Sequence, residues 1–237
     1  MSTASLSTFS RSRFYIGLAA FMSLIVVVGF WPTYFGQLLN GIPNRPWVVH
    51  LHGLIFTGWM VLLITQVILV ATGRTKAHRA LGNFGIAYGF LVLAMGLLIS
   101  IAAPVLHLTA GEQTMDEAAG FLIIPLGDMV LFAVFFIPAV IYRRRPEIHK
   151  RLMLLATTAL LFAAAGRMSN VISMPPAVLL WVSPVLLGIA YDKWTRRKVH
   201  PVYLAGLVIL LVGFSRIFLV QSEGWLRFGR AIVRAFA

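Results

Sequence analysis

The sequence predicts an all-α fold, a polytopic bundle of about seven transmembrane helices with its N-terminus in the cytoplasm. Hydrophobic side chains make up 59% of the 237 residues and charged side chains only 11%, whereas about 25% of an ordinary soluble domain is charged. The apolar residues fall into runs long enough to cross about 30 Å of hydrocarbon. The segments between these runs alternate between strongly basic and weakly charged, as the positive-inside rule predicts.

Seven apolar runs within residues 14–220 are predicted to be the spans. They are Phe14–Trp31, Trp47–Thr72, Phe84–Leu106, Gly120–Tyr142, Leu152–Ile172, Pro176–Tyr191 and Val202–Val220. The sixth run is short and contains two prolines, so we expect a kink or a tilt there. The first run is too long for the apolar part of a cleaved signal peptide and lacks a small-residue cleavage site, which favours a retained signal-anchor helix.

Fourteen of the 20 basic residues lie on one side of this predicted bundle, before the first span or in the loops that follow the second, fourth and sixth. The opposite loops contain Arg45 and three acids, Glu112, Asp116 and Glu117. This asymmetry predicts that residues 1–13 are cytoplasmic and, with seven spans, that the C-terminus is outside. The net charge of +13 therefore mainly reflects topology.

The C-terminal segment 221–237 is basic although the seven-span topology places it outside. Its arginines are spaced by three and four residues, so they share one face of a predicted helix. They are Arg227, Arg230 and Arg234, and Trp225, Phe228 and Ile232 remain for contact with lipid or protein. We expect an interfacial amphipathic helix. A six-span topology with this tail in the cytoplasm is the alternative.

Three of the basic loops each contain one histidine where the next helix is expected to start, namely His78, His149 and His200. Thr75 is a suitable N-cap and Pro146 a suitable first helical residue. This places His78 and His149 in the first turns of their helices. The shared layout indicates a helix-hairpin repeat, although histidine in basic interfacial loops explains it as well.

Asp128, Arg167 and Arg216 fall inside predicted spans, where ionisable residues are costly and are commonly functional. Together with His50 and His52 at the start of the second span, they belong to the outer half of the bilayer. We expect a polar site in which Asp128 carries a proton and either pairs with Arg167 or faces His52. We expect Arg216 to snorkel to the lipid headgroups. A buried ion pair that only fixes helix packing is the alternative.

Histidines are the candidate cofactor ligands, because the chain has no cysteine. His50 and His52 form a His-x-His pair for a metal ion, but two residues apart on a helix they point about 200° from each other. His52 and His78 are 26 residues apart, which is about 39 Å along a helix, so they cannot bind the same haem. His78 and His149 occupy equivalent turns in one leaflet, so they are the pair that can bracket a haem b.

Several other functional classes are not expected. The sequence contains no Walker motif, no Rossmann glycine pattern and no Gly-x-Ser-x-Gly elbow. The basic residues lie in short loops rather than on one folded face, so nucleic acid is not an expected partner. The absence of cysteine excludes disulfides, thiolate metal sites and covalently attached c-type haem.

Motifs over residues 45–170 resemble those of bacterial polytopic inner-membrane families that are catalogued as domains of unknown function. The motifs are His50-Leu-His52-Gly53, His78-Arg79-Ala-Leu-Gly82, Arg144-Arg-Pro-Glu-Ile-His149-Lys-Arg151-Leu-Met153 and Gly166-Arg167. This resemblance implies a membrane location but no activity. In topology and histidine placement the chain also resembles cytochrome b561-type haem proteins, but it departs from that pattern because the fourth span has no histidine.

These observations favour a multi-pass protein of the bacterial inner membrane that is linked to haem, a metal or a quinone, or that is an accessory subunit of a membrane redox complex. His52, His78 and His149 are the candidate cofactor ligands, and Asp128 and Arg167 the candidate catalytic residues. The lipid bilayer and other membrane subunits are the expected partners. A small proton-coupled transporter or channel and a non-catalytic partner of a larger membrane complex are the alternatives.

Overall fold

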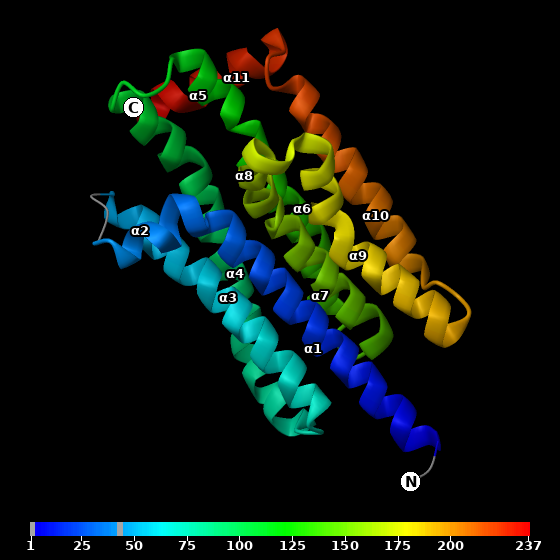
Figure 1. The fold of residues 1–237 in the computed structure, drawn as a ribbon. Helices are drawn as coiled ribbons and strands as arrows, with labels where there is room; N and C mark the ends of the chain where they lie inside the picture. Colours follow the sequence, from blue (N-terminus) through cyan, green and yellow to red (C-terminus); the bar gives the residue numbers. More distant parts are fainter. Residues whose placement is uncertain (1–2, 42–44) are drawn as a thin grey trace.

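The computed structural model describes residues 3–41 and 45–237, and their side chains from residue 13 onward. Every regular element in these ranges is helical. The long helices run roughly alongside one another as a bundle (Figure 1). This arrangement confirms the predicted all-α fold class.

The helices follow one another through short turns. In chain order they are α1 (Thr3–Phe30), the π-helical turn η1 (Trp31–Phe35), α2 (Gly36–Leu39), α3 (Trp47–Ala71), α4 (Thr75–Thr109), α5 (Met115–Phe121), α6 (Ile123–Ile141), α7 (Pro146–Leu160), α8 (Phe162–Ile172), α9 (Met174–Arg196), α10 (Pro201–Phe214), the 3₁₀ turn η2 (Ser215–Leu219) and α11 (Glu223–Phe236).

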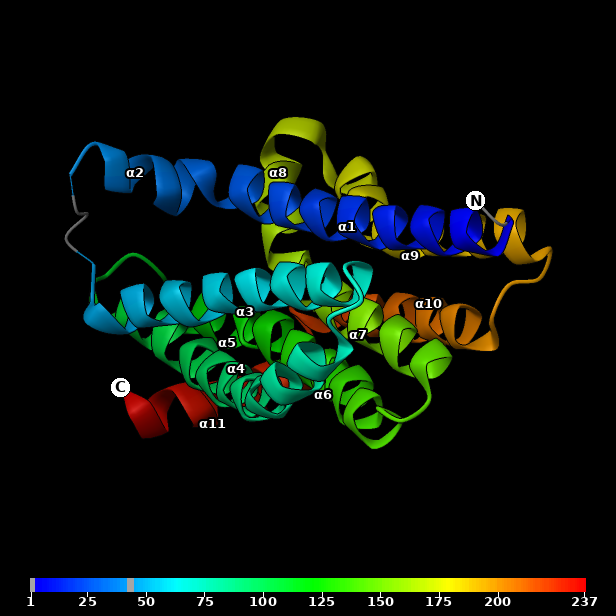
Figure 2. The same ribbon diagram turned by 90° about the horizontal axis from the view of Figure 1, so that it is seen from below.

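Six stretches are long and apolar enough to cross a membrane, and α7 with α8 would be a seventh if this pair, bent by 49°, is one broken span. The chain therefore has the composition and helix lengths of an integral membrane protein. Its two termini lie at opposite ends of the bundle in both views (Figures 1 and 2), which we call the amino end and the carboxyl end. Termini at opposite ends agree with seven crossings rather than with the six-span alternative.

Several predicted spans have different limits in the structure, and the first continues to Leu39 and the fourth begins at Met115. Helix α4 starts at Thr75 rather than at Phe84, because the helix extends beyond its apolar part into the polar boundary. The sixth span is not short, since α9 includes Pro184 and continues past Tyr191 to Arg196. The fifth span is broken at Leu161, between α7 and α8.

Glycines allow several helices to approach closely. A Cβ atom on Gly96 of α4 would lie 1.9 Å from the Met129 sulfur of α6, and one on Gly89 would lie 2.1 Å from the Phe136 ring. A Cβ atom on Gly29 of α1 would lie 2.5 Å from the Ala164 carbonyl oxygen of α8. Small residues at such positions are typical of helix packing in membranes.

Large apolar side chains on the outside of the bundle indicate which surface meets lipid. Val171 is 86% exposed and Phe218 is 77% exposed, which would be unfavourable in water. Trp194 near the amino end and Trp47 near the carboxyl end are also exposed. Tryptophans at both ends of a bundle are typical of the two membrane interfaces.

Helix α11 is amphipathic and packs on α5 at the carboxyl end (Figure 1). Leu226 and Val233 are buried on its inner face. The Trp225 indole donates a hydrogen bond to the Ala119 carbonyl at 2.9 Å, and the Arg230 guanidinium pairs with a carboxylate of α5 at 2.5 Å. The protein therefore covers the face of the tail that carries Trp225.

Candidate functional site

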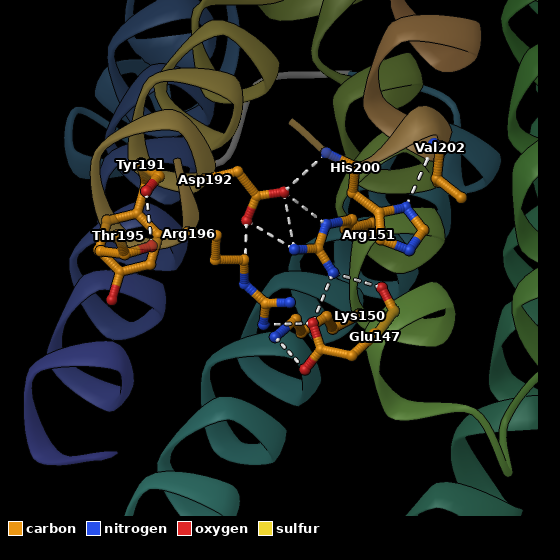
Figure 3. Close-up of polar contacts among 9 residues, drawn as sticks. All are labelled: Glu147, Lys150, Arg151, Tyr191, Asp192, Thr195, Arg196, His200 and Val202. Carbon is orange, nitrogen blue, oxygen red and sulfur yellow. Dashed lines mark hydrogen bonds and ion pairs between the residues drawn. The ribbon is translucent and has the colours of Figure 1, made fainter. Parts of the chain in front are cut away.

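The most completely buried cation is Arg151 of α7, whose side chain has no exposed surface. Its guanidinium donates to both carboxylate oxygens of Asp192 on α9, with Nη2 at 2.6 and 2.7 Å and Nε at 3.0 Å (Figure 3). The remaining nitrogen donates to the Glu147 backbone oxygen at 2.6 Å and to its carboxylate at 2.8 Å. Charge-assisted, bidentate bonds of this kind are strong and strictly oriented.

Further bonds extend this network to α10. The Glu147 carboxylate also accepts from Lys150 at 2.9 Å and pairs with Arg196. The backbone N–H of His200 donates to Asp192 at 3.3 Å, and the His200 Nδ1 accepts from the first turn of α10, at Val202 N, at 3.3 Å (Figure 3). The network therefore joins α7, α9 and α10 at the amino end.

This network was not predicted from the sequence, because the positive-inside rule already accounts for Arg151 in a basic loop. The available signal was the pair of acids, Glu147 and Asp192, in otherwise basic segments. Burial lowers the pKa of His200, and the positive charge of Arg151 acts in the same direction. His200 is the N-cap of α10, and this role requires a neutral imidazole because its Nδ1 must accept a hydrogen bond.

His78 and His149 lie in the first turns of α4 and α7, as predicted. The His149 Nδ1 lies 2.8 Å from the Ala139 carbonyl oxygen. Because a carbonyl only accepts, Nδ1 carries a proton in this bond, and in the neutral tautomer the lone pair is on Nε2. The Nδ1 of His78 is buried without a partner among the described residues. The two imidazoles lie close enough to interact electrostatically.

Asp128 is buried in α6, and its partner is Arg216 of η2 rather than the predicted Arg167. The reason is the helix arrangement, since α6 packs against η2 whereas α8, which carries Arg167, packs against α1 and α9. A Cβ atom on Gly127 would lie 2.3 Å from the Arg216 side chain, so this glycine makes room for it.

The expectation that Arg216 snorkels to the headgroups is wrong. The residue is only 8% exposed. Its Nη1 donates to the Gly213 carbonyl at 2.6 Å, and its guanidinium lies 5.0 Å from the centre of the Phe162 ring. The pair with Asp128 thus has the surroundings of a packing contact.

Arg167 of α8 and His52 of α3 lie elsewhere, and Arg167 is next to Phe30, the last residue of α1. Arg167 donates to the Ala163 carbonyl at 2.8 Å and its guanidinium lies 4.3 Å from the centre of the Phe30 ring. It is close enough to act electrostatically on His52, whose ring packs on Phe56 at 4.2 Å.

His50 and His52 have different neighbours, in agreement with their predicted divergence on a helix. The Nδ1 of His50 lies 3.1 Å from the Tyr34 hydroxyl, whereas His52 faces Phe56 and the charge of Arg167. Among the described residues, no group of three or more His, Cys, Asp or Glu side chains is placed to hold a metal ion.

Comparisons with protein-family models, with curated proteins and with solved structures find no match to this chain. Inference about function therefore depends on the residues and contacts described above. The predicted site residues therefore lie in three separate regions of the bundle. His78 lies near His149, His52 lies near Arg167, and Asp128 is apart from both pairs.

Proposed function

We propose that this chain is an integral membrane redox protein that holds one haem b between His78 and His149 at the amino end of the bundle. The observation that carries the proposal is that the two imidazoles lie near each other in the first turns of α4 and α7 and that each has a ring nitrogen without a partner. His149 is hydrogen-bonded through Nδ1 to the Ala139 carbonyl, which leaves Nε2 available, and the buried Nδ1 of His78 has no partner in the described chain. Metal-ligating histidines are commonly oriented in this way by a hydrogen bond on the second nitrogen.

The number of ligands favours haem over a bare metal ion. A zinc site takes three or four protein ligands, and the described residues offer no group of three. A haem iron needs only two axial ligands, because the porphyrin supplies the other four. The buried Nδ1 of His78, which lacks a partner in the described chain, is the kind of polar atom that such a cofactor would satisfy.

A haem b bound here would supply one-electron chemistry. The chain would orient the ligands. The Ala139 carbonyl accepts the hydrogen bond from His149 Nδ1, so Nε2 is the atom that would bind the iron. Exposed arginines in the adjoining turns, Arg79 and Arg145, would compensate the negative charge of propionates.

The amino end is proposed to face the cytoplasm of a bacterial cell, in its inner membrane. Its loops carry most of the basic residues, and the turns that follow α3, α6 and α9 all lie at this end (Figures 1 and 2). Basic loops are retained on the cytoplasmic side. On this topology the haem would exchange electrons with a partner at the inner leaflet.

Haem content of the purified protein tests the proposal. The wild-type chain, expressed with an adequate haem supply, is expected to retain haem b in detergent, and His78→Ala and His149→Ala to lose it. The matched control is His107→Ala at the opposite end of α4, where the imidazole pairs with exposed Glu112 at 2.5 Å. A wild-type protein without haem, or equal loss in all three variants, would contradict the proposal.

A small proton-coupled transporter is the second candidate, and the observation that favours it is Asp128. This carboxylate is 4% exposed within a membrane-spanning helix, a position typical of proton relays. Proton uptake by proteoliposomes tests this function. Transport abolished in a stably folded Asp128→Asn protein would support it, and transport unaffected by the substitution would exclude Asp128 as the carrier.

A further inference from the structure

A group of cationic and polar side chains gathers at the carboxyl end, where α1, α3 and α8 come together. We call it the outer cationic cluster, and it consists of Tyr34, Gln37, Arg45, His50, His52 and Arg167. Arg45 donates to the Gln37 side chain at 3.0 Å, and the Tyr34 hydroxyl lies 3.1 Å from His50. The charge of Arg45 acts on Arg167, which in turn acts on His52, so these groups share one region.

No carboxylate of the described chain neutralises this cluster. All seven acidic residues lie in the described ranges and interact elsewhere. Glu112 pairs with His107, Asp116 with Arg230, Glu117 caps α5 with Thr114, Asp128 pairs with Arg216, Glu147 and Asp192 bind Arg151, and Glu223 acts on Arg230. Cations within a span, such as Arg167, are normally paired, so the anion that this cluster lacks would come from outside the chain.

Hydrogen-bonding atoms without a partner also indicate that the cluster lacks an anion. The Arg45 Nε and the His52 Nδ1 are buried without a partner in the described chain. Arg167 is exposed at the surface of the bundle, and the hydrogen bond found for it goes to the Ala163 carbonyl, which leaves most of its N–H groups for a ligand. Buried polar groups without partners are costly, and an anion rich in oxygen acceptors would satisfy several of them together.

The cluster also lies at the level of a membrane interface. Trp31 precedes Tyr34 in the chain and Trp47 follows Arg45, and they are 49% and 73% exposed, as is typical of side chains at headgroup depth. Leu54 and Val171, which lie within five residues of His52 or Arg167 in sequence, are 70% and 86% exposed. A ligand whose anionic part meets the arginines would therefore have apolar surface available for a chain.

We propose that the outer cationic cluster binds a phosphate-type anion, presented by the headgroup of an anionic phospholipid. Arg45 and Arg167 would donate to the phosphate oxygens, with arginine favoured for its forked donor geometry. His52 would add a donor from the facing helix. This site is separate from the proposed haem ligands, which lie at the other end of the bundle.

Thermal stabilisation of the detergent-purified chain provides the test. The probes are phosphatidylglycerol, phosphatidylcholine and inorganic phosphate, each added to wild-type protein, to Arg167→Gln and to Arg45→Gln. Because Arg45 precedes α3 and lies outside the spans, Arg45→Gln should fold even if Arg167→Gln does not. The matched control is Arg227→Gln, which removes one exposed charge from α11 at the same end.

We expect phosphatidylglycerol to raise the midpoint more than phosphatidylcholine does. Each cluster variant should bind it about tenfold more weakly, as the loss of one charge-assisted hydrogen bond implies, while Arg227→Gln binds it like the wild type. Stabilisation by inorganic phosphate alone, with the same dependence on the variants, would support the anion site with a free ion as its source. Equal losses in all three variants, or no effect of either anion, would overturn the proposal.

Discussion

The buried pair of Arg151 and Asp192 gives the sharpest stability prediction. Asp192→Asn keeps the size of the side chain but removes its charge. It leaves a fully buried guanidinium that now depends on Glu147, whose side chain is 45% exposed. Breaking one side of a buried ion pair costs about 3–5 kcal/mol. Because Glu147 still holds part of the charge, we expect about 3 kcal/mol, the lower limit of that range.

Replacement of both partners should have a much smaller effect. In Arg151→Met/Asp192→Leu no buried charge remains, and apolar side chains of similar volume commonly replace a buried pair at little cost. We therefore expect the double variant to recover most of the stability lost in Asp192→Asn. The single variants Arg151→Met and Asp192→Leu, the double variant and the wild type form a cycle that isolates the interaction of the pair.

The assay is equilibrium unfolding in mixed detergent micelles, together with the thermal midpoint. A loss of about 3 kcal/mol corresponds to a fall of roughly 6–12 °C for a chain of this length. Asp116→Asn is the control, because it removes a carboxylate from an exposed pair that should contribute little. If Asp192→Asn costs less than about 1 kcal/mol, or if the double variant is no more stable than the single, the assignment of Arg151 as a buried ionic link between helices is refuted.

Two further predictions concern packing and pH. Gly89→Ala should lower the free energy of unfolding by about 1–3 kcal/mol, because the new Cβ would meet the Phe136 ring at 2.1 Å. Gly17→Ala is the control, because nothing lies within 4 Å of its Cβ position, and it should leave the free energy of unfolding unchanged or raise it. Unfolding titrations that rank the two variants alike would contradict this packing. The folded-state pKa of His200 is lowered, so protonation of His200 favours the unfolded chain. The contribution of neutral His200 to stability is therefore present above the unfolded pKa of about 6.5 and is lost as the pH falls through the folded-state pKa. His200→Asn, which retains capping ability, should make the midpoint less dependent on pH below 7, and an unchanged pH profile would rule out this role.

The sequence was sufficient for the features that depend on local pattern. Apolar runs predicted the spanning helices, and Pro146 predicted the start of α7 and hence the first-turn position of His149. The divergence of His50 and His52 also followed from helical geometry. These features need no knowledge of which helices touch.

Partner choice could not be predicted in the same way. Asp128 meets Arg216, 88 residues away, because α6 packs on η2, and no periodicity in either segment encodes that contact. Arg151 meets Asp192, 41 residues away, although the positive-inside pattern alone accounts for arginine in that loop. The outer cationic cluster likewise depends on how α1, α3 and α8 converge.

The most direct test of the proposed function is the dithionite-reduced minus oxidised absorption spectrum of the detergent-purified wild-type chain. Two histidine ligands predict a low-spin b-type haem, with a Soret shift and a sharp α band on reduction. A protein that is folded by circular dichroism, was expressed with an adequate haem supply and shows no change on reduction would contradict the assignment of His78 and His149 as haem ligands.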